Sequence, residues 1–151
     1  MRKVALFAVV LALAVTAVAF AQAKPDFSGA WALDATKSDQ MGGGGRGPGG
    51  PGPMTIKHTA TELAITRGEN TMTYKLDGTE TVIASQRGDS KATAKWEGNA
   101  LVITTVRPGM DGGAMTTKAT YTMEGENLVV TTNMNTPNGE INRKVFYKKG
   151  S

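Results

Sequence analysis

Two stretches of the chain carry almost the same alternation of apolar and polar positions. Residues 96–105 read WEGNALVITT and residues 123–132 read MEGENLVVTT. After each Glu-Gly pair the pattern has a period of two and is rich in β-branched residues, which is typical of strands. Another alternating run precedes each glycine, so each copy is predicted to be a β-hairpin with a glycine turn. We attribute the similarity to the residue pattern that β-hairpins commonly share and not to gene duplication.

The same pattern recurs over most of the chain. Residues 54–58, 62–66 and 71–76 alternate in this way, and residues 141–148 form a last predicted strand. Turn signals recur about every eight to twelve residues, a spacing typical of all-β sandwiches and barrels. Short hairpin connections favour a meander, and a long meander can remove its edges by closing. We therefore predict an all-β, up-and-down antiparallel meander closed into a small barrel of about 8–10 strands.

The beginning of the chain has a different pattern. Arg2 and Lys3 precede an almost unbroken apolar run over residues 4–20, which ends in Ala-Gln-Ala at residues 21–23. This is typical of a secretory signal peptide, and the run is short for a membrane anchor. We predict a signal peptide over residues 1–23 and one periplasmic or secreted domain over residues 24–151, without stable membrane insertion after cleavage. The chain has no cysteine, so packing alone must stabilise that domain.

One segment of low complexity interrupts the predicted domain. Residues 41–53 read MGGGGRGPGGPGP. Such a composition cannot pack a core, so we predict a disordered surface loop without a binding role. A phosphate-binding loop would need Gly-Lys-Ser/Thr before a helix, and an RNA-binding tract would need several arginines where this segment has only Arg46.

The charge of the chain argues against nucleic acid as a partner. The 17 Lys and Arg residues against 13 Asp and Glu residues give a net charge of +4, which falls to +2 without Arg2 and Lys3. This excess is too small for a nucleic-acid-binding surface. The lysines also occur singly along the predicted strands, as on a solvated sheet face.

The opening of the predicted domain, DFSGAWALDATKS at residues 26–38, carries a family resemblance. A Gly-x-Trp on the first strand, here Gly29 to Trp31, resembles the lipocalin and fatty-acid-binding protein superfamily, the calycins. The longer run is similar to small exported bacterial lipocalin-like proteins. The resemblance implies that Gly29 and Trp31 close one end of the barrel. The chain lacks the Thr-Asp-Tyr signature and the disulfide, and a short polar piece and the glycine loop stand where a helical lid would be.

The resemblance also implies that a basic residue of the last strand covers Trp31. The period of two places these residues on one face: Ile141, Arg143, Val145 and Tyr147. Counting back from the end of the chain instead places Lys144 and Phe146 inward. Because the first register has three apolar residues against one, we expect Arg143 beside Trp31.

The candidate chemistry of the chain is sparse. His58 is the only histidine, and without cysteine or a second histidine the residues do not make a metal site. A role of His58 as a haem ligand is disfavoured, because a histidine at a strand end is more often hydrogen-bonded or exposed to solvent. A Ser-His-Asp site is disfavoured as well, because nothing in the sequence locates the partners of this histidine. The acids fall mostly in turns, with no pair placed for acid–base work. We therefore predict a non-enzymatic protein without a cofactor.

The residues predicted to face the interior are mostly aromatic and thioether side chains. The candidate ligand-binding residues are Met72, Tyr74, Trp96, Tyr121, Met123 and Arg143. They indicate either a lumen for a small apolar molecule with at most one acidic group, or a core filled by side chains, to which we give a slight preference. In the second case the protein acts through surface loops, with residues 107–113 as the candidate, as a protease inhibitor or an envelope assembly partner. We take ligand binding as the predicted function and the protein-binding module as the alternative.

Overall fold

The computed structural model describes residues 24–39, 52–84, 86, 88–109, 111–136 and 138–150. The predicted signal peptide over residues 1–23 lies outside the described residues. The same holds for the predicted glycine loop except for Gly52 and Pro53.

The described residues form a 10-stranded antiparallel sheet. Its strands are β1 (Gly29–Asp34), β2 (Met54–His58), β3 (Glu62–Arg67), β4 (Asn70–Lys75), β5 (Thr81–Ile83), β6 (Ser90–Glu97), β7 (Ala100–Pro108), β8 (Ala114–Glu124), β9 (Asn127–Thr136) and β10 (Gly139–Lys149). Their order in the sheet is β4-β3-β2-β1-β10-β9-β8-β7-β6-β5. Successive strands pair as hairpins, and β1 pairs with β10.

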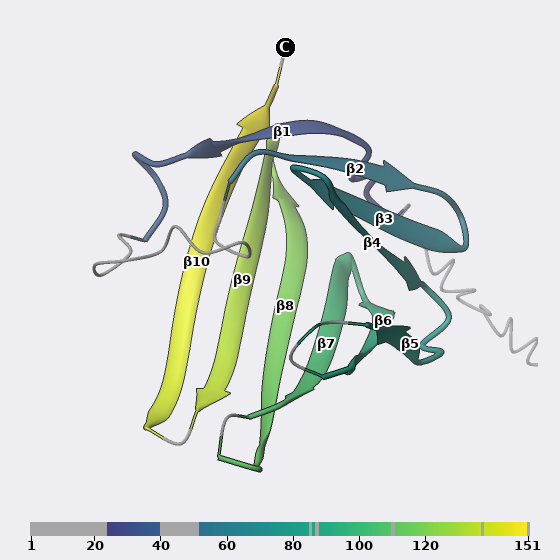
Figure 1. The fold of residues 1–151 in the computed structure, drawn as a ribbon. Coiled ribbons are helices and arrows are strands. Elements are labelled where there is room, and N and C mark those ends of the chain that lie inside the picture. The colour runs from purple at the N-terminus through teal and green to yellow at the C-terminus, as the bar shows by residue number, and fades with distance from the viewer. Residues whose placement is uncertain are drawn as a thin grey trace, which may run out of the picture.

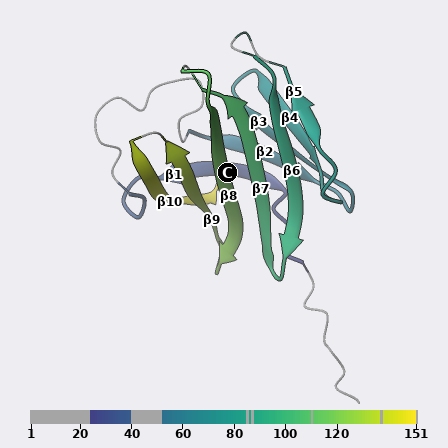
Figure 2. The ribbon, with the colours of Figure 1, turned by 90° about the horizontal axis from the view of Figure 1, so that it is seen from below.

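The sheet curls into a nearly closed barrel, as the alternation predicts. Strands β1 to β4 run across one end of the long strands β8 to β10 (Figure 1), and the view from below shows the two groups facing each other (Figure 2). The edge strand β4 contacts β5 and β6 without a hydrogen-bonded ladder between them. The all-β meander and its barrel shape are thus confirmed.

The two similar stretches are the hairpins β6–β7 and β8–β9. Glu97 pairs with Ala100 across the first turn, and Glu124 pairs with Asn127 across the second. The glycine of each turn, Gly98 or Gly125, has a φ of 63°. Glycine reaches this left-handed conformation at little cost, and it stands first of two central residues, as in a type II′ turn. The sequence similarity therefore reflects two copies of one turn geometry.

Strand β5 is an element that the pattern did not predict. It has only three residues, Thr81–Ile83, and its central Val82 is 58% exposed. A run this short gives too few positions for a period of two to be recognised. It lies at the edge of the sheet, where short strands with an exposed face are common.

The core fills the end of the barrel that β1 crosses. Phe27, Leu101 and Leu128 each have no exposed surface, and Trp31 is 2% exposed. The indole Nε1 of Trp31 donates a hydrogen bond to the Phe27 carbonyl oxygen at 2.8 Å. Burial of these large side chains removes much apolar surface from water, which is the main stabilising term for a chain without disulfides.

The basic residue over Trp31 is Lys149, not Arg143 as expected. Lys149 pairs directly with Trp31 across β1 and β10, and its Nζ lies 5.5 Å from the centroid of the indole ring. A Cβ on Gly29 would approach the Lys149 Cε to 3.1 Å, so the missing side chain at Gly29 leaves room for this lysine. The inward face predicted by the alternation is right for Val145 and Tyr147, which are buried, but Ile141 on the same face is 49% exposed. Arg143, however, lies too far from the end of β10 to reach Trp31.

The region after β1 holds a turn where the resemblance implied a helical lid. Residues 35–39 follow β1, and the Asp39 amide donates to the Lys144 carbonyl oxygen at 2.9 Å. The Phe146 amide donates to Ser38 Oγ, also at 2.9 Å. These bonds fasten the turn to β10. Nowhere in the described ranges is there a helix of the length and hydrophobicity that crossing a bilayer needs.

Candidate ligand cavity

A cavity of about 250 Å³ lies inside the barrel, away from the filled end. Its lining comes from β3, β4 and the four long strands β7 to β10. The lining residues are Ile65, Arg67, Met72, Tyr74, Arg107, Thr117, Ala119, Tyr121, Val130, Thr132, Met134, Arg143, Val145 and Tyr147. The interior is therefore partly filled and partly hollow, and the slight preference for a fully filled core is wrong.

Three arginines approach the cavity from three different strands. Arg67 ends β3, Arg107 lies near the end of β7, and Arg143 lies in β10. Arg67 and Arg143 are half-buried, whereas Arg107 is exposed and therefore belongs to the mouth. Two of them continue an apolar inward face, since Arg67 follows Leu63 and Ile65 and Arg143 precedes Val145 and Tyr147. The alternation of inward and outward side chains along these strands thus places the arginine side chains toward the interior of the barrel.

Three tyrosines, which are all the tyrosines of the chain, face these arginines. Tyr74, Tyr121 and Tyr147 are between 1% and 6% exposed. Burial raises the pKa of each phenol above its ordinary value, and the positive charge of Arg67 opposes that rise at all three. Burial has the larger effect, so the phenols stay neutral at ordinary pH and keep a hydroxyl proton to donate.

Arg67 connects this group of side chains. It forms a side-chain hydrogen bond with Tyr121, and its Nη2 lies 3.5 Å from the Met54 sulfur. The Tyr74 hydroxyl donates toward the Met72 sulfur, also at 3.5 Å. Sulfur is a weak acceptor, so these contacts satisfy the donors less well than an oxygen anion would.

The raised tyrosine pKa values make the fold sensitive to alkali. The folded state holds the phenolic protons more tightly than the unfolded state, whose tyrosines ionise near pH ~10. The stabilising effect is therefore complete below about pH 10 and is lost as the pH rises above it. We expect the absorbance of tyrosinate to appear late, together with unfolding, whereas the protein in denaturant titrates near pH ~10. Folded protein that ionises near pH 10 without unfolding would contradict this burial.

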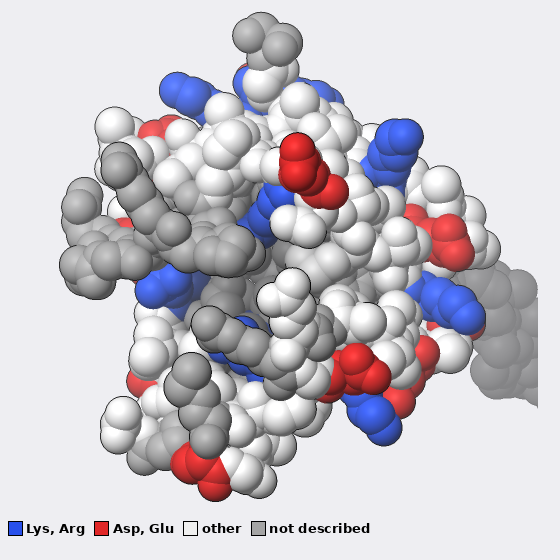
Figure 3. All heavy atoms as spheres, viewed as in Figure 1, with Lys and Arg blue, Asp and Glu red and all other residues white. Residues whose placement is uncertain are grey.

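No acidic side chain of the described residues lines the cavity. All 13 Asp and Glu residues of the chain lie in the described ranges, and none of them lines the cavity. Among the described residues Arg107 and Arg143 form no ion pair, because every ion pair found there joins an acid to a lysine or to His58. The face in Figure 3 is hollowed in its middle, with basic side chains in blue at the hollow and an acidic one in red at its rim. The cavity wall therefore carries an excess of positive charge.

The rest of the wall is apolar. Ile65, Val130 and Val145 are buried around the cavity, and Met72 and Met134 add flexible thioethers. Burying an apolar chain against such a wall is favourable by roughly 25 cal/mol per Å². Thioethers adapt to irregular shapes, so this part of the wall accepts different apolar groups.

The structure brings four of the six predicted ligand-binding residues together. Met72, Tyr74, Tyr121 and Arg143 line the cavity. Trp96 and Met123 do not, although both face inward and pack against the core. They lie next to the β6–β7 and β8–β9 turns, where Trp96 pairs with the buried Leu101 and Met123 pairs with the buried Leu128. Trp96 and Met123 therefore face the interior, but they pack against the core and do not line this cavity.

Several lining residues were missed, most notably Arg67, Arg107 and Tyr147. The signal for Arg67 was present, since Leu63, Ile65 and Arg67 continue one alternation. Tyr147 was placed on the inward face of the last strand but was not selected. Arg107 follows Thr105 in the same register, yet it was assigned to a surface loop. Nothing in the sequence alone places these three strands around one cavity.

The other end of the barrel is closed by a small aromatic stack. The Phe27 ring lies 5.7 Å from both the His58 and the Trp96 rings, and it is tilted against Tyr121 at 6.3 Å. Lys24 Nζ lies 5.3 Å from the Trp96 ring centroid. Trp96 therefore helps to close this end.

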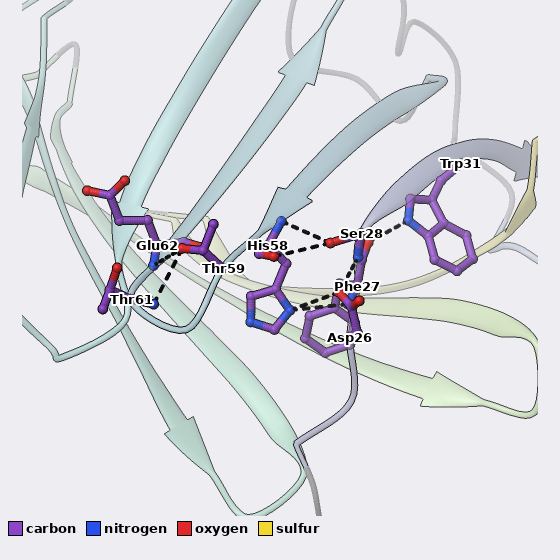
Figure 4. Close-up of polar contacts among 8 residues, drawn as sticks. All are labelled: Asp26, Phe27, Ser28, Trp31, His58, Thr59, Thr61 and Glu62. Atoms are coloured by element: carbon purple, nitrogen blue, oxygen red, sulfur yellow. Dashed lines mark hydrogen bonds and ion pairs between the residues drawn. The ribbon is translucent and has the colours of Figure 1, made fainter.

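Polar contacts fix the segment before β1 to the end of β2 (Figure 4). His58 Nδ1 accepts a hydrogen bond from the Phe27 amide at 3.3 Å and lies 3.4 Å from Asp26 Oδ1. Ser28 Oγ accepts from the His58 amide at 3.1 Å and approaches the His58 carbonyl at 3.3 Å. Hydrogen bonds from Ser28, with a smaller effect of His58, lower the pKa of Asp26.

This arrangement is not a catalytic triad, although Asp26, Ser28 and His58 are adjacent. The Ser28 hydroxyl contacts the backbone of His58 and not its imidazole, so the ring does not activate it. The described residues also contain no group of three or more His, Cys, Asp or Glu side chains that could hold a metal ion. The cluster acts as a structural fastening.

Comparisons with known proteins give a fold and no family. The sequence matches no protein-family model and no curated protein. Zebrafish ileal bile acid-binding protein, solved with cholic acid, is 19% identical and has a TM-score of 0.56, over 82% of this chain and 98% of that chain. Fatty-acid-binding protein 1 of Echinococcus granulosus is 15% identical with a TM-score of 0.56, over 83% and 98%. Secretory abundant heat soluble protein 4 of Ramazzottius varieornatus is 18% identical with a TM-score of 0.55, over 82% and 94%.

At these identities the similarity concerns the fold. The chain has the calycin-like barrel that its opening run resembles, with a TM-score of 0.56 to the bile acid-binding protein. The narrower resemblance to small exported bacterial proteins stays a prediction.

Proposed function

We propose that the protein is a non-enzymatic barrel that binds, in its cavity, a small molecule with an apolar body and an anionic group. One observation carries this proposal: arginines and neutral tyrosines line the cavity, while none of the 13 acidic residues does. Guanidinium groups removed from water are costly unless an anion accompanies them. A bound anion would accept charge-assisted hydrogen bonds from arginine and tyrosine.

The fold of the neighbours supports a binding role. A barrel of this fold, the zebrafish ileal bile acid-binding protein, was solved with cholic acid, and a fatty-acid-binding protein shares the fold as well. Both names describe proteins that bind acidic, largely apolar molecules. The wall of the present cavity offers the same two kinds of contact through its own residues.

The size of the cavity favours a small ligand. Its volume of about 250 Å³ is that of about eight water molecules at ~30 Å³ each. Pockets for drug-sized ligands usually measure about 300–1,000 Å³. A short amphiphile therefore suits this barrel better than a long-chain lipid.

The proposal is tested by calorimetric titration of delipidated protein with n-octanoate. We expect saturable binding at one site with a Kd in the micromolar range, because the carboxylate meets the arginines while the chain is buried. n-Octylamine, which is cationic at neutral pH, is the matched control and is expected not to bind. Equal binding of both compounds, or binding of neither, would contradict the proposed site.

The alternative function, a protein-binding module with a filled interior, receives less support. It requires a barrel without a cavity, and the barrel is hollow at one end. Arg107, at the start of its proposed binding loop, lines that cavity. We therefore propose that this arginine serves the interior of the barrel.

We propose further that the domain is exported, on the basis of the apolar run and Ala-Gln-Ala of residues 4–23. The intact mass of protein from the envelope or medium is expected to correspond to residues 24–151. A mass that retains residues 1–23 would contradict cleavage.

A further inference from the structure

The cavity carries more positive charge than one carboxylate can balance. Arg67, Arg107 and Arg143 reach it from β3, β7 and β10. A carboxylate has two oxygens, and a single guanidinium fork can engage both. If Arg143 holds both oxygens of octanoate in this way, Arg67 and Arg107 make no contact with the ligand.

The neutral hydrogen-bond donors around the cavity also favour a ligand with several oxygens. Tyr121 and Tyr147 line the cavity together with Arg67, and Tyr121 forms a side-chain hydrogen bond with Arg67. Thr117 and Thr132 add two more hydroxyls to the lining. So many donors suit a head group with several outward oxygens.

The arginines also differ in depth, which sets their roles. Arg67 is half-buried and lies among the three tyrosines, whereas Arg107 is exposed at the mouth. Arg143 is half-buried in the cavity wall and pairs with Thr132 across β9 and β10. An anion between Arg67 and Arg143 would thus still feel the charge of Arg107.

We propose that the cavity selects a doubly charged tetrahedral head group, that of an organic phosphate or phosphonate with a short apolar chain. This inference rests on the proposed function and narrows its ligand class. A phosphate monoester offers three outward oxygens and a charge of about −1.5 to −2 at pH 7. It can accept from two guanidinium groups and a phenol at once, while its chain lies against Ile65, Val130 and Val145.

The test compares n-octyl phosphate with n-octyl sulfate by calorimetry. The two ligands share chain, shape and outward oxygens, but the sulfate has one charge at every pH used, whereas the phosphate has nearly two at pH 8 and one at pH 5. At pH 8 we expect the phosphate to bind at least ~10-fold more tightly. At pH 5 the two affinities should converge. The sulfate corrects for any effect of pH on the protein itself.

The possible results separate this inference from the proposed function. Equal affinities at pH 8 would overturn the selection of a dianion, while binding of both compounds would leave the proposed function intact. Binding of none of octyl phosphate, octyl sulfate and octanoate would overturn both. Inorganic phosphate alone is expected to bind far more weakly than octyl phosphate. Equal binding of inorganic phosphate would contradict the role of the apolar chain.

A substitution at the mouth tests the charge argument without endangering the fold. Arg107→Met changes an exposed side chain, so the melting temperature should change little. It is expected to weaken octyl phosphate at pH 8 more than octyl sulfate, which reduces the ratio of their affinities. Lys91→Met, at an exposed lysine that pairs with Glu80, is the control and should leave the ratio unchanged. If Arg107→Met left the ratio of the two affinities unchanged, Arg107 would not contribute to the preference for the doubly charged ligand.

Discussion

Replacing Trp31 with alanine is expected to lower the free energy of unfolding by about 3–5 kcal/mol. Trp31 is 2% exposed, packs in the filled end of the barrel and donates to the Phe27 carbonyl oxygen. The substitution leaves a large void, removes that hydrogen bond and exposes the face on which Lys149 rests. Chemical denaturation followed by circular dichroism measures the change.

A matched control separates this effect from a general sensitivity to substitution. Val82 is 58% exposed on the edge strand β5, so Val82→Ala should change stability by less than about 0.5 kcal/mol. Lys149→Met removes only the cation over the indole and should cost roughly 0.5–1 kcal/mol. If Trp31→Ala melted within a few degrees of the parent protein, Trp31 would not hold the end of the barrel closed.

The second large effect concerns ligand binding and not stability. Arg143→Met is expected to weaken octanoate binding by about 10- to 100-fold, which corresponds to the ~1.5–3 kcal/mol of a hydrogen bond to a charged group. Arg143 lines the cavity and forms no ion pair with a described residue. Methionine keeps most of the volume of the side chain, so the fold should be retained.

The neighbouring residue provides the control. Lys144 lies on the opposite face of β10, where its Nζ contacts Glu124 Oε1 at 3.1 Å. Lys144→Met removes the same charge from the protein but leaves the cavity unchanged, so octanoate should bind as it does to the parent. Equal losses in both variants would indicate a general electrostatic effect and would contradict a specific role of Arg143.

The sequence predicts which way a side chain faces better than how deep it lies. The period of two correctly turned Trp96, Tyr121 and Met123 inward, yet only Tyr121 lines the cavity. Every second residue of a strand points inward along its whole length. Whether that residue meets core or cavity depends on its distance from the strand end and on the strands across the barrel. Those distances are properties of the closed sheet.

The same limit explains the partner of Trp31. Arg143 and Lys149 share one face of β10, and the alternation alone does not distinguish them. The pairing of Trp31 with Lys149 decides the contact. The Gly-x-Trp run predicted that Trp31 is buried, but the register between the first and last strands is set over long range.

One end of the barrel therefore stabilises the fold, while the other end provides the proposed binding site. Phe27, Trp31 and Trp96 fill and close one end, while arginines and tyrosines surround a hollow toward the other. A filled end lets the protein fold without a ligand. The charged hollow gives an anion a place that the chain does not occupy with a carboxylate of its own.

The most direct test of this division is the position of the bound anion, measured by amide chemical shifts in NMR during titration with octanoate. We expect the largest changes at cavity residues such as Thr117, Thr132 and Arg143, and small changes at the closed end, near His58 and Trp96. Saturable changes that cluster instead around His58 and Trp96, or no change at any amide, would contradict a ligand site in the cavity.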